Sequence, residues 1–370
     1  MERDTDRAVR LGAAAAEADG CLPLLDALGA ESLRFPVPWQ HLHPPGAGGR
    51  HGTARAARRD VPPALAGAGS RPAIVLQGAG LPEPLRAAGG WTDRTTAEAF
   101  GSYAGALARA LGDRVALWTT VDDPWSSAFA EHAGGAAFAA AHHLALAHGL
   151  AAAALRRELG DGAAVAVSLR LHVTLPEDEG DAAHLEAVRH RDLVNNHVFL
   201  GPMLDGSSPT DLIARTRHLT DWSFVRPGDL HVTRCRLDSL QLQPRDPAVA
   251  RPGRQADGVH VLEPVSFDPV EVLSDVLRAV DGVFPGVPLS VLTSPASAAD
   301  LDRTLAAVEE AAADGIDLRE HLLVVDGLPP EVVDAHARAV AERRAARAAR
   351  EVVEEPAATG LFRRLLRRRN

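Results

Sequence analysis

Two adjacent carboxylates are the strongest candidates for acid–base chemistry in this chain. Asp122 and Asp123 follow the β-branched run 115–120, which predicts a strand, after one further valine. If both side chains are buried, each disfavours the charge of the other, and the raised pKa makes one of them a general acid. If they are solvated, they are ordinary polar residues at the end of a strand. The sequence leaves both interpretations open.

Further candidates lie at or near the ends of other expected strands. Arg34, in the run 32–37, could form a buried structural ion pair with one of the aspartates or belong to a working site. His172, at the end of the run 164–172, is either a satisfied loop residue or a base. Trp125 could pack in the core or line the mouth of a pocket. The glutamines that could line the same pocket are Gln77, Gln241 and Gln243.

Nucleophilic and metal chemistry have weaker candidates. Thr293 and Ser294 stand where the expected strand Leu289–Thr293 ends. A hydroxyl becomes a nucleophile only when a base lies beside it, and the neighbouring sequence offers none. The only cysteines, Cys21 and Cys235, are too far apart in sequence to suggest a disulfide framework or a zinc site. We therefore expect neither a metal nor a cofactor.

The composition is that of a globular protein with a large core. The chain has 370 residues, 46% of them hydrophobic and 24% charged, which excludes wholesale disorder and a collagen-like fibre. The net charge of −10 argues against general nucleic-acid binding, because a negative surface repels phosphates. Every basic residue is arginine, which is typical of a GC-rich bacterial genome. We find no transmembrane run and no leader with a cleavage site, so we expect a cytoplasmic protein.

Short β-branched runs alternate with Ala-rich helical stretches, which predicts repeated βα units around a parallel sheet. The expected strands are 9–13, 32–37, 73–77, 115–120, 164–172, 237–242, 259–262, 289–293 and 322–325. The expected helices are 53–66, 95–111, 136–159, 182–204, 269–279 and 299–314. About eight such units fit a (β/α)₈ TIM barrel better than an open sheet. The first unit has an alternative, because residues 7–28 could form one long helix.

The composition changes after the last expected strand. We assign residues 1–328 to the barrel, 329–355 to a charged Ala/Arg-rich helix and 356–370 to a disordered basic tail. In residues 361–369, arginines surround Leu361, Phe362, Leu365 and Leu366. As a helix this segment could lie on an anionic membrane or partner surface. The alternative is a solvated, frayed terminus.

Several segments, in order along the chain, resemble glycoside hydrolase family 1, the β-glucosidase family of retaining enzymes. Residues 33–39 read Leu-Arg-Phe-Pro-Val-Pro-Trp, which is similar to the family's Tyr-Arg-Phe-Ser-x-x-Trp. Residues 112–125 resemble the fourth-strand segment that ends in Asn-Glu-Pro-Trp, and residues 142–149 resemble the helix after it. Similar matches continue through Phe199-Leu200-Gly201-Pro202 and 237–240 to 288–291 and 314–319, and the resemblance covers roughly residues 8–325. It implies a (β/α)₈ barrel, here with trimmed loops.

The same resemblance implies where the catalytic carboxylates should be. Retaining glycosidases need an acid/base and a nucleophile about 5–5.5 Å apart. Asp123 holds the acid/base position with a side chain one methylene shorter than the family's glutamate, and Asp122 replaces the asparagine before it. Thr293 replaces the nucleophilic glutamate, with Ser294 next to it. Positions at which the family binds sugar are also replaced, namely by 78–80, 243–244 and Val324.

These departures leave three hypotheses for function. The first is a pseudoenzyme whose barrel binds a small molecule or a protein at its top face, the face at the carboxyl ends of the strands. The second is a repurposed enzyme that uses Asp122, Asp123 and His172 as acid/base groups on a modified glycoside or a non-sugar substrate, including an inverting hydrolase. The third is weak residual β-glycosidase activity.

Overall fold

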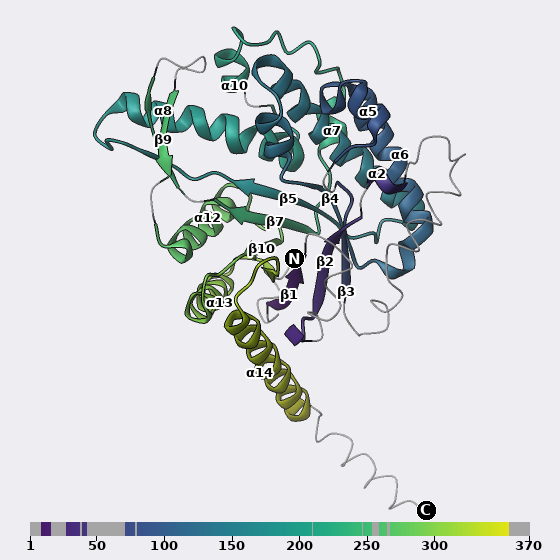
Figure 1. The fold of residues 1–370 in the computed structure, drawn as a ribbon, viewed down its shortest axis with the longest axis vertical. Coiled ribbons are helices and arrows are strands. Elements are labelled where there is room, and N and C mark those ends of the chain that lie inside the picture. The colour runs from purple at the N-terminus through teal and green to yellow at the C-terminus, as the bar shows by residue number, and fades with distance from the viewer. Residues whose placement is uncertain are drawn as a thin grey trace, which may run out of the picture.

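Eight parallel strands close into a barrel with helices around it (Figure 1). The computed structural model describes residues 9–15, 27–37, 39–42, 71–77, 80–208, 210–245, 247–253, 259–264 and 267–354. The strands follow one another around the barrel in the order β1-β11-β10-β7-β5-β4-β3-β2. Their bounds are β1 Arg10–Ala14, β2 Ser32–Pro36, β3 Arg71–Val75, β4 Leu117–Asp122, β5 Val165–Leu171, β7 Ser239–Pro244, β10 Leu289–Thr293 and β11 Leu318–Val324. The predicted TIM barrel is confirmed.

The first barrel strand decides between the two interpretations of the N-terminal region. Strand β1 pairs in parallel with β11 and with β2, so a single helix over residues 7–28 is wrong. Gly12 lies so close to Ser32 and Leu322 that an added Cβ would collide with both side chains. A strand buried on both faces reads as a continuous apolar run, which explains its ambiguity in the sequence.

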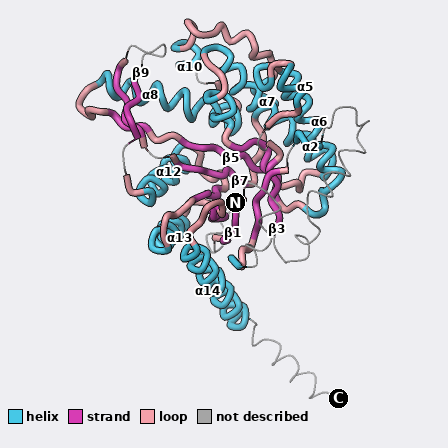
Figure 2. Tube along the Cα trace, viewed as in Figure 1, coloured by secondary structure: helices cyan, strands magenta, loops and turns pink. Residues whose placement is uncertain are grey.

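One predicted barrel strand belongs to a separate sheet. Residues 259–262 lie in β9 (Val259–Pro264), which pairs antiparallel with β8 (Ala248–Pro252). Strand β8 also pairs with β6 (Thr174–Pro176), and this small sheet lies beside α8, away from the barrel (Figure 2). The expectation of a barrel strand here is wrong, because strand propensity does not say which sheet a run will join.

The helices that flank the barrel lie close to their predicted positions. In chain order they are α2 Trp39–Leu42, α5 Glu83–Ala87, α6 Arg94–Leu111, α7 Gly134–Leu159, α8 Ala182–Asp192, α9 Val198–Leu200, α10 Thr210–Arg215, α11 Asp229–Thr233, α12 Pro269–Val283, α13 Ala298–Ala313 and α14 Pro330–Glu354. Short 3-10 helices occupy Gly90–Thr92 and Gly112–Arg114, and π-helical turns occupy η3 Ser126–Ala130, η4 Leu193–His197 and η5 Gly201–Asp205. The predicted helix 53–66 and the basic tail lie outside the described residues. Helix α14 begins against α13, and its far end extends away from the barrel (Figure 1).

Helix α7 packs closely against α6 through small residues. A Cβ added at Gly101 of α6 would lie 3.0 Å from the Cβ of Leu150 of α7. On another side of α7, a Cβ added at Gly149 would collide with the backbone of Val232 of α11. Within the described residues, α7 alone has the length and hydropathy of a membrane-spanning helix. The sequence analysis predicted no such run. However, 83% of that apolar window is buried inside the protein, as in the core helix of a globular domain.

Polar side chains cross the interior of the barrel. Strands β2 and β7 lie on opposite sides of the closed sheet, and Arg34 Nε donates a hydrogen bond to Gln241 Oε1 at 2.9 Å. Thr119 Oγ1 donates to the same oxygen at 3.1 Å. Both Arg34 and Gln241 are buried. This bridge forms a polar floor across the barrel.

Candidate active site at the barrel top

A cavity of about 470 Å³ lies above this floor, at the carboxyl ends of the strands. We call it the barrel-top cavity. Its lining residues are Ala14, Ala15, Arg34, Pro36, Gln77, Asp122, Asp123, Ser126, Ser127, Arg170, Gln243, Leu292, Val324 and Asp326. Active sites of TIM barrels lie at this end, because the carboxyl ends of all eight strands meet there. Five of the predicted site residues are brought together, namely Arg34, Gln77, Asp122, Asp123 and Gln243.

Asp122 and Arg34 form an ion pair in this cavity. Arg34 Nη2 lies 2.8 Å from Asp122 Oδ1, and the two side chains are 6% and 28% exposed. The contact has the distance of an ion pair but not the alignment of a hydrogen bond, because Nη2 has no hydrogen-bond partner among the described residues. Gln243 Nε2 donates to Asp122 Oδ1 at 2.9 Å, and Gln77 Oε1 accepts from the Asp122 backbone N–H at 3.0 Å. The two glutamines therefore fix the aspartate from both sides.

Asp123 has a different partner and an unusual backbone. Its φ of +46° lies in the left-handed region, which few residues other than glycine adopt. Its carboxylate accepts from the Ser126 backbone N–H at 3.2 Å and from Ser126 Oγ at 2.7 Å, so it caps the turn that follows. Arg170 Nε lies 3.2 Å from Asp123 Oδ2. Each aspartate therefore has its own arginine, which offsets the repulsion expected between two unpaired neighbours.

Thr293, which the family resemblance aligns with the nucleophile, is turned away from the cavity. Thr293 does not line it, whereas Leu292 does. Thr293 Oγ1 lies 2.8 Å from Nε2 of His321, which is fully buried on the neighbouring strand β11. Burial lowers the pKa of His321 to about 3, so the ring is neutral at pH 7. The sequence next to Thr293 offers no base, and the structure adds one from another strand, His321, but this pair is outside the cavity. Ser294 is exposed.

His172 and Trp125 also lie outside the barrel-top cavity. Their rings are 4.3 Å apart, and Trp125 Nε1 donates to Asn195 Oδ1 at 3.1 Å. Burial, together with the positive charges of Arg245 and other arginines, lowers the pKa of His172 to about 3. The ring is therefore neutral, and the structure does not bring it to Asp122 and Asp123.

Sequence reasoning missed Arg170 and Asp326 in the cavity lining. Arg170 shares one face of β5 with Ser168, and the alternation of a strand is a signal that could have found it. Asp326 follows the last barrel strand by two residues. In the described part of the chain, no group of three His, Cys, Asp or Glu side chains could hold a metal ion.

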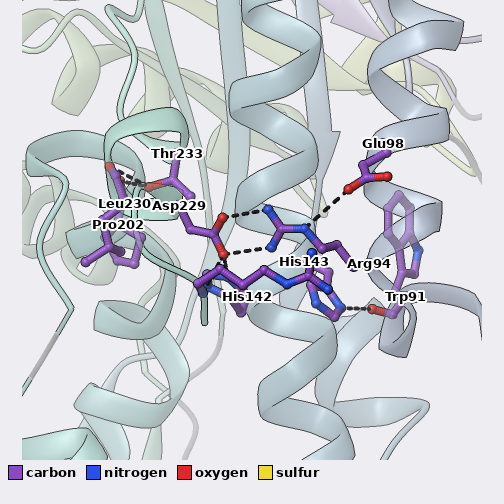
Figure 3. A network of polar contacts seen from close by, with 10 residues as sticks. Trp91, Arg94, Glu98, His142, His143, Pro202, Asp229, Leu230 and Thr233 are labelled. Carbon is purple, nitrogen blue, oxygen red and sulfur yellow. Dashed lines mark hydrogen bonds and ion pairs between the residues drawn. The ribbon is translucent and has the colours of Figure 1, made fainter. Parts of the chain in front are cut away.

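A second charged cluster lies outside the barrel, between α6, α7 and α11 (Figure 3). Arg94 donates two hydrogen bonds to Asp229, at 2.6 and 2.8 Å, and His142 Nε2 lies 2.8 Å from Asp229 Oδ2. Burial acts to raise the pKa of Asp229, but the hydrogen bonds from Arg94, the Arg226 backbone and His142 outweigh it and lower the pKa. His143 contacts the carbonyl oxygen of Trp91 at 3.0 Å. This cluster joins three helices, and none of its residues lines the barrel-top cavity.

Comparison with known protein families identifies the family of this barrel. The model of glycosyl hydrolase family 1 matches residues 17–247. The chain belongs to glycosyl hydrolase family 1. The resemblance seen in the sequence is therefore confirmed at the level of family and fold.

Two similar proteins illustrate the extent of the similarity. A bifunctional β-D-glucosidase/β-D-fucosidase of Bifidobacterium breve is 36% identical over 259 residues, which are 60% of this chain and 55% of that protein. A thermostable β-glucosidase B of Thermobispora bispora is 31% identical over 343 residues, or 81% of this chain and 69% of that protein. The chain thus spans little more than half the length of the Bifidobacterium protein.

Solved structures show the same barrel. The AHE enzyme from Alicyclobacillus herbarius superposes with a TM-score of 0.74 at 25% identity, covering 81% of this chain and 75% of that one. A β-glucosidase from Exiguobacterium antarcticum gives a TM-score of 0.77 at 19% identity, covering 89% and 86%, which shows the fold alone.

Proposed function

We propose that this family 1 barrel binds a small polar ligand in the barrel-top cavity and does not hydrolyse glycosides by the retaining route. The supporting observation is that Thr293, at the position of the nucleophile, bonds to His321 while Leu292 lines the cavity. Retaining hydrolysis needs a second carboxylate about 5–5.5 Å from the acid. A threonine that faces away from the cavity cannot take that role.

The cavity floor indicates what such a ligand would carry. Arg34 lines the cavity, and its Nη2 has the ion pair with Asp122 but no aligned hydrogen-bond partner among the described residues. An acceptor oxygen on a bound molecule, or a water, can complete the hydrogen bonding of this guanidinium. The volume of about 470 Å³ is within the range of small-molecule sites. We therefore expect a ligand with hydroxyl, carbonyl or carboxylate oxygens.

A repurposed hydrolase is the second candidate function, and Asp326 favours it. Asp122, Asp123 and Asp326 line one cavity. An inverting hydrolase needs two carboxylates about 6.5–9.5 Å apart, one as acid and one as base, and no nucleophile. On this proposal Asp123 protonates the leaving group and Asp326 activates water.

Hydrolysis of 4-nitrophenyl β-D-glucoside, β-D-fucoside and β-D-galactoside by the purified chain tests the two functions. We expect no release of nitrophenol above that of the Asp123→Ala variant. Turnover that disappears in Asp123→Ala, and also in Asp326→Ala, would instead establish the inverting enzyme. Turnover that needs Asp123 but not Asp326 would establish residual β-glycosidase activity by another route.

Binding needs a separate measurement, because absence of hydrolysis alone does not show a ligand. We expect at least one compound in a panel of sugars, sugar acids and polyols to raise the melting temperature of the parent chain but not of Gln243→Ala. If no compound does so, the small-ligand proposal is wrong. Four further expectations remain predictions. They are a protein partner at the top face, a contact of residues 361–369 with an anionic surface, a cytoplasmic location and the absence of nucleic-acid binding.

A further inference from the structure

A further cavity, of about 500 Å³, lies between α8 and α12, where the chain leaves β5. We call it the α8–α12 cavity. Both helices lie on the same side of the barrel (Figure 1). No described residue lines both this cavity and the barrel-top cavity. Neither of the functions proposed above uses it.

Two helices form the walls of the α8–α12 cavity. On each helix the lining residues are three or four positions apart, so one face of each helix borders the cavity. The inner side is closed by Leu171 at the end of β5 and by Leu200 of α9, both of them buried. The apolar members of the two walls are Leu185 and Val188 of α8 and Val276, Ala279, Val280 and Val283 of α12.

Large apolar side chains are exposed in this cavity. Three such side chains are exposed in the described part of the chain, and two of them, Leu185 and Val283, line the α8–α12 cavity with exposed fractions of 48% and 59%. Single exposed apolar residues are ordinary, whereas two in one cavity form a surface that a bound molecule can remove from water. Because the walls are mainly Leu, Val and Ala, ring stacking contributes little, and an aliphatic chain is favoured over a flat aromatic molecule.

An ion pair occupies the polar part of the lining. Asp192 Oδ2 lies 3.1 Å from His197 Nε2, and Asn196 Nδ2 donates to Asp192 Oδ1 at 2.7 Å. Burial acts to raise the pKa of Asp192, but the hydrogen bonds from His197 and Asn196 outweigh it and lower the pKa. The same contact raises the pKa of His197. Both oxygens of Asp192 therefore have partners within the protein, and its charge is matched.

Asp275 gives the cavity an unmatched negative charge. This residue of α12 is exposed and lines the cavity, and within the described residues its carboxylate forms no ion pair or hydrogen bond. Arg189, the arginine of the lining, pairs instead with Asp211. His172 also lines the cavity, but burial and nearby arginines lower its pKa to about 3, so its ring is neutral. A cation on a bound molecule is therefore matched by Asp275, whereas an anion is repelled by it.

We propose that the α8–α12 cavity binds an aliphatic amine in its protonated form. The alkyl chain lies between the apolar faces of α8 and α12 and covers Leu185 and Val283, and the ammonium group pairs with Asp275. His172, a candidate from the sequence that lies outside the barrel-top cavity, contributes a neutral ring to this lining.

Calorimetric titration of the full chain at pH 7 with octylamine, 1-octanol and octanoate tests this proposal, because the three probes share a chain and differ in head-group charge. We expect octylamine to bind about threefold more tightly than 1-octanol, the gain typical of one exposed ion pair, and octanoate to bind most weakly. Asp275→Asn should remove the difference between the amine and the alcohol, and Asp275→Glu, which keeps the charge, should retain it. If octanoate binds as tightly as octylamine, the proposal is wrong.

Two control variants test whether the preference belongs to this cavity. Glu271→Gln removes a carboxylate from the same helix outside the cavity lining, and it should leave the preference for octylamine unchanged. Gln243→Ala, in the barrel-top cavity, should also leave the affinity for octylamine unchanged, so the test is independent of the function proposed for that cavity. Loss of octylamine binding in Gln243→Ala would place the probe at the barrel top and overturn the proposal.

Filling the α8–α12 cavity should abolish binding of all three probes. Ala279→Phe fills it from an exposed position on α12, and Val188→Phe fills it from α8 should the first variant fail to fold by circular dichroism. A folded cavity-filling variant that binds octylamine like the parent would overturn the proposal. Absence of octylamine binding to the folded parent at millimolar concentration would do the same.

A second copy of the chain is the alternative occupant of this apolar surface, and the oligomeric state distinguishes it from a small molecule. We expect the parent and Val283→Glu to have the same mass by size-exclusion chromatography with light scattering. A parent dimer that Val283→Glu converts into a monomer would show that another copy covers the cavity, and the proposal would be wrong.

Discussion

Two arginine–aspartate pairs in this molecule have similar contact distances and opposite surroundings. Arg34 and Asp122 lie 2.8 Å apart at the top of the barrel, and Arg94 and Asp229 lie 2.6 Å apart between helices. The Asp122 side chain is 28% exposed and borders a cavity, whereas the Asp229 side chain is 4% exposed. Distance alone therefore does not separate a pair that holds the fold from one that is available to a ligand.

The number of hydrogen bonds that each carboxylate accepts does separate them. Asp229 accepts from both Nη atoms of Arg94, from the Arg226 backbone N–H and from His142 (Figure 3). At the barrel top, the Asp122 carboxylate accepts one hydrogen bond among the described residues, from Gln243, and pairs with Arg34. A buried carboxylate surrounded by four donors stabilises one arrangement of helices, whereas a carboxylate with fewer donors beside a cavity can still bind another molecule.

The largest expected difference between the two regions is the cost of removing each aspartate. Asp229→Ala leaves Arg94 without its main partner in a buried site, and we expect a loss of about 3–5 kcal/mol in the free energy of unfolding. Asp122→Ala should cost about 1–2 kcal/mol, because water in the cavity can solvate Arg34. Urea denaturation of the two variants beside the parent chain measures both. An equal loss would mean that the barrel-top pair is also purely structural.

Acid should weaken the helical side of the molecule through buried histidines. His148 of α7 is fully buried, with Nδ1 2.6 Å from Thr120 Oγ1 and Nε2 3.2 Å from Cys235 Sγ. Burial lowers its pKa to about 4, below the value of about 6.5 expected in the unfolded chain. Between these values the unfolded chain binds a proton that the folded chain does not. Stability is therefore complete above pH 6.5 and falls with decreasing pH by about 1.4 kcal/mol per unit for this group, down to about pH 4.

The variant His148→Gln isolates this contribution, because an amide can hydrogen-bond to Thr120 without titrating. Urea denaturation at several pH values from 7 to 4 should give a shallower loss of stability for the variant. Other buried histidines, including His321, keep some pH dependence in both proteins. Equal slopes for parent and variant would show that His148 does not remain neutral in the folded chain.

The sequence predicts which residues gather at the barrel top, because parallel strands end at one face. Arg34, Asp122 and Gln243 come from three different strands and still lie together as expected. It also predicts most helix positions, since Ala-rich periodic stretches have few alternatives. These features depend on the local hydrophobic pattern and on the number of βα units, and both can be read from the sequence.

Side-chain direction at the strand ends cannot be predicted in the same way. A shift of one residue reverses the face, so Leu292 lines the cavity while Thr293 points toward His321. His172 lies beyond the end of β5, where the chain leaves the barrel, and its ring turns to Trp125. The ion pair between Arg170 and Asp123 forms where Asp123 has a positive φ, and the sequence does not predict that backbone conformation.

The smallest expected effect concerns Thr293. Thr293→Val keeps the shape of the side chain and removes the hydroxyl that contacts His321 Nε2. Loss of one hydrogen bond to a buried neutral ring should lower the free energy of unfolding by about 1 kcal/mol. Because the hydroxyl lies outside the barrel-top cavity, the variant should bind every compound that binds the parent with the same affinity, measured by the same thermal-shift panel. A change in ligand affinity without a change in stability would instead place Thr293 within the ligand site. The statement that this hydroxyl lies outside the barrel-top cavity would then be wrong.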